Sequence, residues 1–266
     1  MAIITISRGT FSGGRELAEL VASELGYECV SREILVEAAQ SYGVSLDKLS
    51  GALEETPGIL QGMSLERAHY LAYIQATLSK YAQSERLVYH GHAGHLLLYN
   101  VPHVLRVKVI ASMEYRIDNA MERKTLSREQ AIRFINKIDS DRARWTKFLY
   151  HVDWNDLSLY DLVINLDRMT VNGASEIICL TAQSPEFQPD AKSRKILSDL
   201  VLATEVRARI ASRANAHDDG LEVEADDGII TLSGTVRSYD DADKIRELVR
   251  QMPDVKEFHS RMGARW

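Results

Sequence analysis

A glycine-rich segment near the start of the chain carries the residue types that phosphate binding requires. It reads Ser7-Arg8-Gly9-Thr10-Phe11-Ser12-Gly13-Gly14-Arg15-Glu16-Leu17-Ala18, after the apolar run Ile3 to Ile6 and before apolar residues at helical spacing. Amide groups at a helix N-terminus lack partners within the helix and carry a partial positive charge, so a glycine loop that leads into a helix can bind phosphate. The segment therefore predicts a phosphate site built from Arg8, Gly9, Thr10, Ser12, Gly13, Gly14, Arg15 and Glu16.

The loop departs from the standard P-loop pattern at two positions. Counted from Gly9, Arg15 stands where lysine is expected, and Glu16 stands where the pattern has a magnesium-binding serine or threonine. Arg8 or Arg15 could replace the lysine, because a guanidinium binds phosphate through its planar fork. Glu16 could bind the metal, repel the phosphates, or only complement the helix dipole. Taken alone, the pattern also fits a turn that binds nothing.

Three histidines and two cysteines are the other candidate ligands. His90, His92 and His95 have the spacing His-x-His-x-x-His, and imidazoles are common metal ligands. No cysteine or spaced carboxylate set stands near them, so we predict no metal site and favour His92 as a contact to a bound substrate. Cys29 and Cys179 have no metal-like spacing and are predicted to be buried free thiols.

Strands that alternate with helices must position these residues. The β-rich runs 87–89, 104–110 and 162–164 are separated by helical patterns, which predicts an α/β fold with a parallel sheet flanked by helices. Ser127 and Gln130 form a capping-box pattern that opens a helix predicted to run through Ile138.

The last third of the chain follows a different pattern. Polar residues with Pro185 and Pro189 interrupt the apolar periodicity. Beyond them the order is helix (198–213), strand (221–224), turn, strand (229–236), helix (240–251) and strand (255–262), which predicts a small α+β (αββαβ) domain in which Gly228 takes a positive φ. The predicted organisation is a domain at 1–182, a linker at 183–196 and a second domain at 197–266.

Bulk composition narrows the function classes. The 266 residues carry a formal net charge of −6, which argues against non-specific binding of nucleic acid. No apolar run approaches the length of a membrane span, and the run at residues 3–6 is too short for a signal peptide. A cytoplasmic protein is expected.

The N-terminal part also resembles the cytidylate-kinase-like family of P-loop proteins. The resemblance rests on Ile6-Ser7-Arg8 with Ser12 to Ala18, on Gly91-His92-Ala93, on Arg116 and Arg123, on Asp139, Arg142 and Arg144, and on Tyr160 to Asn165. It spans about residues 2 to 180, with these motifs in the family's order. Phe11 stands where the family has glycine, so its ring is expected to crowd the phosphates.

This resemblance implies phosphoryl transfer from ATP, with Mg²⁺, to a nucleoside monophosphate or another small acceptor. It implies catalytic roles for Arg15, Arg116, Asp139, Arg142 and Arg144, phosphate binding by Arg123, and acceptor binding by His92 and Ser31. For each arginine, a salt-bridged position on a helix surface remains the alternative.

The C-terminal part resembles BON domains, through Val223 to Val236 and the following helix. Such domains are associated with binding, so the resemblance implies a protein or phospholipid partner. Acidic residues outnumber basic ones from Lys195 onward, so net charge would not attract an anionic membrane.

Two functions remain open. The first is a kinase that the BON-like domain regulates or localises. The second is a catalytically inactive nucleotide-binding sensor that signals through the BON-like domain. Phe11, Glu16, Ser31 and the missing lysine favour the sensor, whereas Arg116, Asp139, Arg142 and Arg144 favour the enzyme. A homodimer is compatible with the helix-rich pattern, although no specific residue indicates one.

Overall fold

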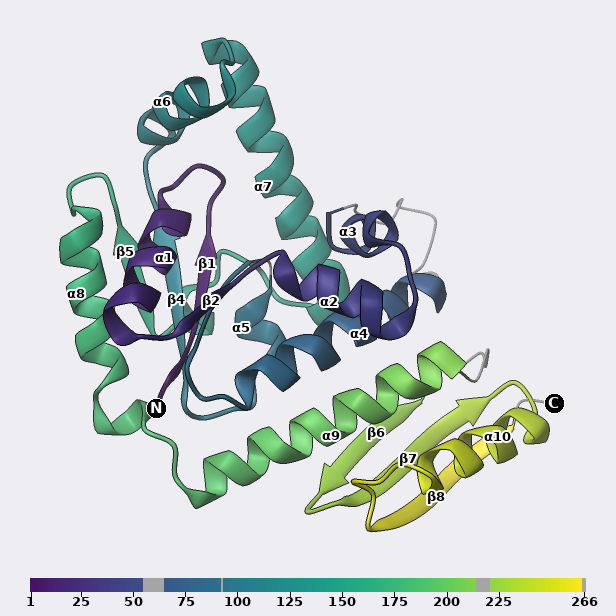
Figure 1. Ribbon diagram of the computed structural model, residues 1–266. Coiled ribbons are helices and arrows are strands. Elements are labelled where there is room, and N and C mark those ends of the chain that lie inside the picture. The colour runs from purple at the N-terminus through teal and green to yellow at the C-terminus, as the bar shows by residue number, and fades with distance from the viewer. Residues whose placement is uncertain (55–64, 92, 214–220, 265–266) are drawn as a thin grey trace. The chain divides into compact units, whose positions relative to one another are not determined.

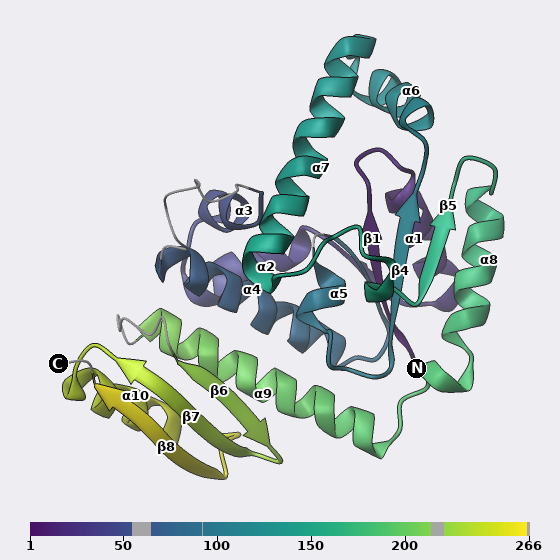
Figure 2. The ribbon, with the colours of Figure 1, turned by 180° about the vertical axis from the view of Figure 1, so that it is seen from behind.

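The main sheet of the protein is fully parallel. The computed structural model describes residues 1–54, 65–91, 93–213 and 221–264 (Figure 1). The strands are β1 (Ile3–Arg8), β2 (Glu28–Val30), β3 (Leu87–His90), β4 (Val104–Ile110) and β5 (Leu162–Asn165), in the order β2-β3-β1-β4-β5. Figure 2 shows β1, β4 and β5 side by side from behind. The predicted α/β architecture is confirmed.

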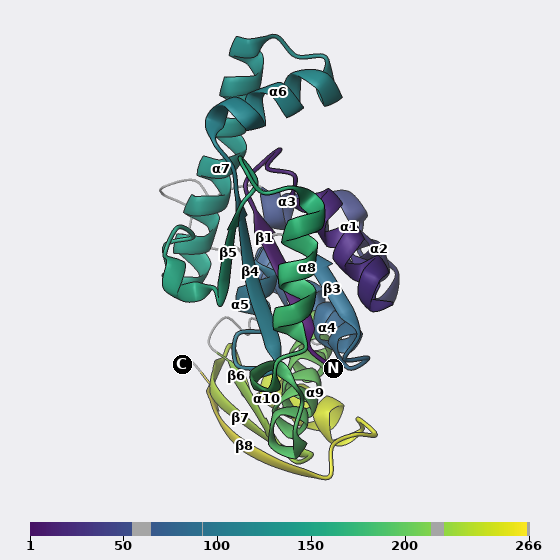
Figure 3. The ribbon, with the colours of Figure 1, turned by 90° about the vertical axis from the view of Figure 1, so that its left-hand side faces the viewer.

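The two faces of this sheet carry different side chains. Ile4 and Ile6 of β1 pack with Val107 and Val109 of β4 in an apolar core that also takes in buried residues of α1 (Gly14–Leu25) and α8 (Val171–Ala182). The edge view in Figure 3 places α1 and α8 on one side of the sheet, and α5 (Gly94–Leu97) and α7 (Arg128–Tyr150) on the other. Because successive strand residues point to opposite faces, Ser7 and its register partner Lys108 lie on the α5 side.

A helical hairpin stands beyond the carboxyl ends of the strands. It consists of α6 (Met113–Lys124) and the first part of α7, side by side in Figure 1. The capping box of Ser127 and Gln130 is present with both of its hydrogen bonds, as predicted. The prediction that this helix ends near Ile138 is wrong, because α7 runs on to Tyr150. No glycine or proline interrupts residues 139–150, and the fully buried Trp145 anchors this part of the helix.

The C-terminal domain has the predicted order of elements. These are α9 (Ala191–Arg213), β6 (Glu222–Asp226), β7 (Ile229–Val236), α10 (Tyr239–Arg250) and β8 (Glu257–Ala264), with β6–β7 antiparallel and β7–β8 parallel. Gly228 has a φ of 84° in the β6–β7 turn, as expected. Helix α9 begins seven residues before the predicted Ser198, because residues 191–197 contain good helix formers and no glycine or proline.

The contacts between residues divide the chain into two units. The first contains the parallel sheet with α1, α5, α6, α7 and α8. The second contains α2 (Glu33–Tyr42), most of α3 (Leu46–Glu54) and α4 (Leu65–Ala82), together with α9, α10 and the small sheet. Cys29 and Cys179 are free thiols that are half-buried, so the predicted full burial is not observed. Across the described residues, no helix combines the length and apolar composition that a membrane span requires.

Candidate active site

The predicted glycine loop connects β1 to α1, and its glycines are sterically required. Gly13 has a φ of 81° and stands at the N-cap of α1. Because it has no side chain, no N-cap side chain accepts a hydrogen bond from the first amides of α1. A Cβ on Gly13 would lie 2.9 Å from Leu166 Cδ1, and one on Gly14 would lie 2.7 Å from Arg8 Cδ. Ser12 closes the loop by donating from its hydroxyl to Gly9 O at 2.9 Å. Larger residues would not fit this turn.

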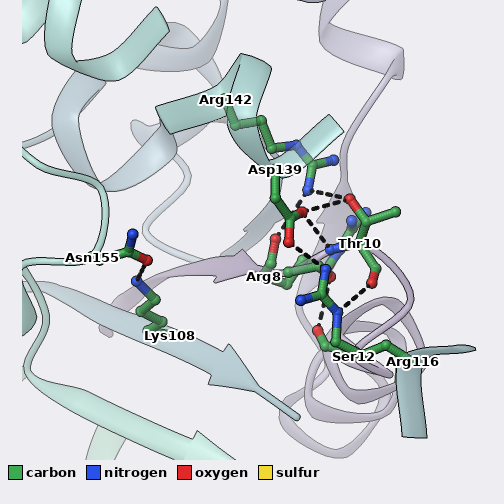
Figure 4. A network of polar contacts seen from close by, with 9 residues as sticks. Arg8, Thr10, Ser12, Lys108, Arg116, Asp139, Arg142 and Asn155 are labelled. Atoms are coloured by element: carbon green, nitrogen blue, oxygen red, sulfur yellow. Dashed lines mark hydrogen bonds and ion pairs between the residues drawn. The ribbon is translucent and has the colours of Figure 1, made fainter. Parts of the chain in front are cut away.

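Three residues of the α6–α7 hairpin converge on Thr10 (Figure 4). Asp139 accepts hydrogen bonds from Thr10 N at 3.1 Å and from Thr10 Oγ1 at 2.8 Å. Arg116 donates to Thr10 O at 2.8 Å and pairs with Asp139. Arg142 donates from Nη1 to Arg8 O at 3.1 Å and to Thr10 Oγ1 at 3.3 Å. The structure thus brings together three of the predicted catalytic residues.

Arg8 is held beneath the loop by His90. Its Nη2 donates to His90 Nδ1 at 3.1 Å, because a guanidinium has no acceptor. Burial, followed by repulsion from Arg142, lowers the pKa of Arg8 to about 10. Burial, followed by the charge of Arg8, lowers the pKa of His90 to about 4, so the imidazole is neutral at pH 7. The charge of Arg8 beside the loop is therefore not cancelled by His90, the last residue of β3.

Phe11 packs against the hairpin rather than over the glycines. Its ring centroid lies 5.9 Å from that of Phe134, and it packs against an apolar cluster containing Ile117, Ala131 and Ile135. The atoms nearest to the Cβ positions of Gly13 and Gly14 belong to Leu166, Tyr115 and Arg8. The ring of Phe11 therefore does not crowd the phosphate site as expected, because a φ of 61° at Phe11 directs the side chain to the hairpin.

Other predicted site residues lie apart from this cluster. Arg15 is 67% exposed and pairs with Glu19 one turn along α1, and Arg144 is 65% exposed and pairs with Asp141. Helix periodicity explains both, since residues three or four apart share a face. Arg123 pairs with Glu16 and so partly neutralises the carboxylate at the magnesium position.

The predicted acceptor-binding residues are Ser31 and His92. The amide of Ser31 donates to Glu33 Oε2 at 2.7 Å, and His92 lies outside the described residues. Within the described ranges, no three His, Cys, Asp or Glu side chains gather as a metal-binding group.

A buried polar cluster beside the loop was missed from the sequence. Lys108 is only 4% exposed and donates to Trp154 O at 2.7 Å, while Trp154 Nε1 donates to Ser7 Oγ at 2.9 Å. Tyr160 donates to Trp154 O at 3.1 Å. Burial lowers the pKa of Lys108. A lysine between Val107 and Val109 in an apolar strand was the available signal, because such residues are rarely buried without partners.

Comparisons with known proteins agree with both resemblances. A family model described as the cytidylate kinase-like family matches residues 3–168, and a BON domain model matches residues 198–262. A curated cytidylate kinase from Methanothrix thermoacetophila is 30% identical over 177 residues, which cover 66% of this chain and 94% of the relative. One from Methanopyrus kandleri is 26% identical and covers 66% of this chain and 90% of its own length.

A solved structure supports the fold alone. An uncharacterized protein from Eubacterium ventriosum aligns with a TM-score of 0.56 at 19% identity. The alignment covers 69% of this chain and 99% of that protein.

Proposed function

Because the chain belongs to the cytidylate kinase-like family, we propose that it transfers a phosphoryl group from ATP to a nucleoside monophosphate or a similar small acceptor. The observation that carries the proposal is the placement of three arginines at the glycine loop: Arg116 and Arg142 donate to its carbonyl oxygens, and the Arg8 side chain packs against Gly14. Phosphoryl transfer depends on positioning two anions and neutralising the transferred group, and these groups are suited to that task.

The charge balance of the loop favours a polyanion. The guanidinium groups of Arg116 and Arg142 donate to the carbonyl oxygens of residues 10 and 8, and the Arg8 side chain packs against Gly14. Asp139 is the carboxylate that is hydrogen-bonded to this segment. Positive charge that is partly removed from water is stabilised by an anion that can accept several hydrogen bonds. A triphosphate supplies such oxygens, and the partial positive charge at the start of α1 adds to the attraction.

The residues present fit ATP and its metal. Gly13 and Gly14 carry no Cβ, so phosphate oxygens can approach the backbone amides at the start of α1 closely. One oxygen of Glu16, Oε2, is buried without a hydrogen-bond partner among the described residues, so Glu16 would hold Mg²⁺ together with the nucleotide's phosphates. The ion would supply charge neutralisation on the phosphates.

The chain's own groups then have separate tasks. The amides at the start of α1 bind and orient the phosphates, and Arg116 and Arg142 neutralise charge on the transferred group from the hairpin side. Arg8, with its pKa of about 10, stays protonated at pH 7. The neutral His90 holds Arg8 in place without cancelling its charge.

The names of the relatives, which are cytidylate kinases, support a choice of acceptor. We propose a pyrimidine nucleoside monophosphate, with Ser31 and His92 in contact with it. We also propose that the BON-like domain regulates or localises this activity through a protein or phospholipid partner.

A second candidate function is a nucleotide-binding sensor without catalysis. The pairing of Arg123 with Glu16 favours it, because this contact engages the carboxylate at the position that a metal ligand would take. Arg15, which stands at the lysine position of the motif, also points to Glu19 rather than to the loop.

Binding and turnover of nucleotides together test these proposals. Thermal stability is measured with ATP, ADP and CMP, with and without Mg²⁺, and product formation is then assayed, because a ligand that binds only the folded state raises its stability. Arg142→Ala should weaken ATP binding by about 10- to 100-fold, since one charge-assisted hydrogen bond contributes about 1.5–3 kcal/mol. Arg133→Ala, on the exposed face of the same helix, is the matched control.

Each outcome favours a different function. Turnover of CMP supports the kinase, whereas stabilisation by ATP without turnover supports the sensor. Equal ATP affinity in the Arg142→Ala variant and the wild-type protein would contradict both functions as described.

A further inference from the structure

Asp139 binds the same kinds of donor that recognise a phosphoryl oxygen. Its carboxylate accepts from a backbone amide and a hydroxyl, both of Thr10, and pairs with the guanidinium of Arg116. Backbone amides of glycine-rich loops, hydroxyl groups and arginines are the usual partners of phosphate in proteins. The carboxylate therefore lies where the loop and the hairpin together would bind an anion.

The donors that bind Asp139 are the ones that a phosphoryl group at this loop would need. The guanidinium of Arg116 lies over Gly9, with Cζ 3.3 Å from the position of a Cβ there, and Arg142 Nη1 is 3.3 Å from Thr10 Oγ1. An amide N–H points at one acceptor at a time. A phosphoryl group that takes the Thr10 amide must therefore displace the carboxylate.

We propose that Asp139 is an internal competitor for a phosphoryl subsite formed by Thr10, Arg116 and Arg142. This inference rests on the proposed function and specifies how that site is regulated. The carboxylate fastens the α6–α7 hairpin to the loop, and a nucleotide phosphate replaces it there. One negative group exchanges for another, so the donors keep a partner throughout.

The apolar contact of Phe11 allows Asp139 to be replaced while the hairpin stays beside the loop. The ring of Phe11 packs against Phe134 and the cluster around Ile117, and Asn119 Nδ2 donates to Phe11 O at 3.2 Å. These contacts involve neither Asp139 nor the Thr10 amide. They hold the hairpin beside the loop while the polar contacts change, and Asp139, with 22% of its side chain exposed, turns toward water.

The exchange lowers the affinity of the wild-type protein for phosphates, because every bound phosphate must break the contacts of Asp139. Removing the carboxylate should therefore strengthen binding. If Asp139 instead positioned a catalytic group or contacted the ligand favourably, its removal would weaken binding or leave it unchanged. The direction of the change separates the two roles.

The test is calorimetric titration of the full chain with ATP and with inorganic pyrophosphate. Asp139→Asn should lower the Kd for both about tenfold, which corresponds to 1.4 kcal/mol and is within reach of one charge-assisted hydrogen bond. Asp139→Ala should change Kd in the same direction. Glu129→Gln removes an equal charge from an 84%-exposed position on the same helix and should leave Kd unchanged.

Hydrogen exchange gives a second measurement that does not depend on ligand. In Asp139→Asn the amides of α6 and the first half of α7 should exchange faster than in the wild-type protein, and those of α8 should not. If wild-type protein binds ATP while both Asp139 variants bind it equally or more weakly, the inference is wrong and the proposed function stands. If the wild-type protein and all three variants bind neither ATP nor pyrophosphate, the proposed function itself fails.

Discussion

Phe11 combines a strained backbone with a ring that joins the loop to the hairpin, and both contributions can be measured. A fully buried phenylalanine costs about 3–5 kcal/mol when it is cut to alanine. The ring of Phe11 is only partly buried, so Phe11→Ala should lower the free energy of unfolding by ~2 kcal/mol, about half that value. Alanine keeps the cost of the left-handed backbone at φ 61°.

Glycine at the same position separates the two effects. Phe11→Gly loses the ring but removes the backbone strain, which is worth about 1–2 kcal/mol before the greater flexibility of unfolded glycine is subtracted. The glycine variant should therefore be more stable than the alanine variant by ~0.5–1 kcal/mol. This order is the reverse of the one expected at an ordinary helix or strand position.

Urea denaturation of the full chain measures these differences, and Leu180→Ala, at a 73%-exposed position, is the control that should change little. Hydrogen exchange should place the loss in α6 and α7. If Phe11→Ala matched the wild-type protein in stability, the ring would not anchor the hairpin. If Phe11→Gly were less stable than Phe11→Ala, the strain argument would be wrong.

Three further changes test the account at other positions. Thr125 is an exposed β-branched residue that ends α6 with a φ of 52°, a left-handed conformation that glycine adopts without strain. Thr125→Gly should therefore raise the free energy of unfolding by about 1 kcal/mol. An equal or lower denaturation midpoint would contradict this. Gly14→Ala should lower the free energy of unfolding by about 1–3 kcal/mol, because the added Cβ clashes with Arg8. Gly173→Ala should raise it by about 0.5–1 kcal/mol, because no atom lies nearer than 3.4 Å to a Cβ at that position. Changes of the same sign in both variants would refute the steric argument. The pKa of His90 is lowered from 6.5 to about 4, so the unfolded chain binds the proton first and the free energy of unfolding should fall as pH drops from 6.5 to 4. His90→Gln keeps an acceptor for Arg8 and should flatten this pH dependence in urea titrations between pH 7 and pH 4. An unchanged slope would exclude His90 as its source.

The sequence was informative wherever local pattern determines structure. The parallel sheet follows from alternating strand and helix patterns, and the capping box at Ser127 follows from two residues three apart. The glycine loop was found because a turn that leads into a helix has a composition of its own. In each case the signal lies in residues that are close in the chain, although the strands of the sheet themselves pair with distant ones.

Predictions about individual side chains depended on contacts between distant residues. Arg15 stands at the lysine position of the motif, yet its helix face directs it to Glu19, and Arg8 lies beneath the loop instead. The partners of Phe11 lie more than a hundred residues away, so nothing near it in the chain revealed where its ring packs. Lys108 was missed because its partner Trp154 follows two helices later.

The central claim is that the first amides of α1 and the arginines of the α6–α7 hairpin together bind a polyphosphate. A crystal structure of the full chain grown with Mg²⁺ and a non-hydrolysable ATP analogue tests it most directly. The account predicts phosphate oxygens within hydrogen-bonding distance of the Gly13 and Gly14 amides and of Arg142, with the Asp139 carboxylate moved off Thr10. A nucleotide bound elsewhere, with the Thr10 and Asp139 contacts intact, would contradict it.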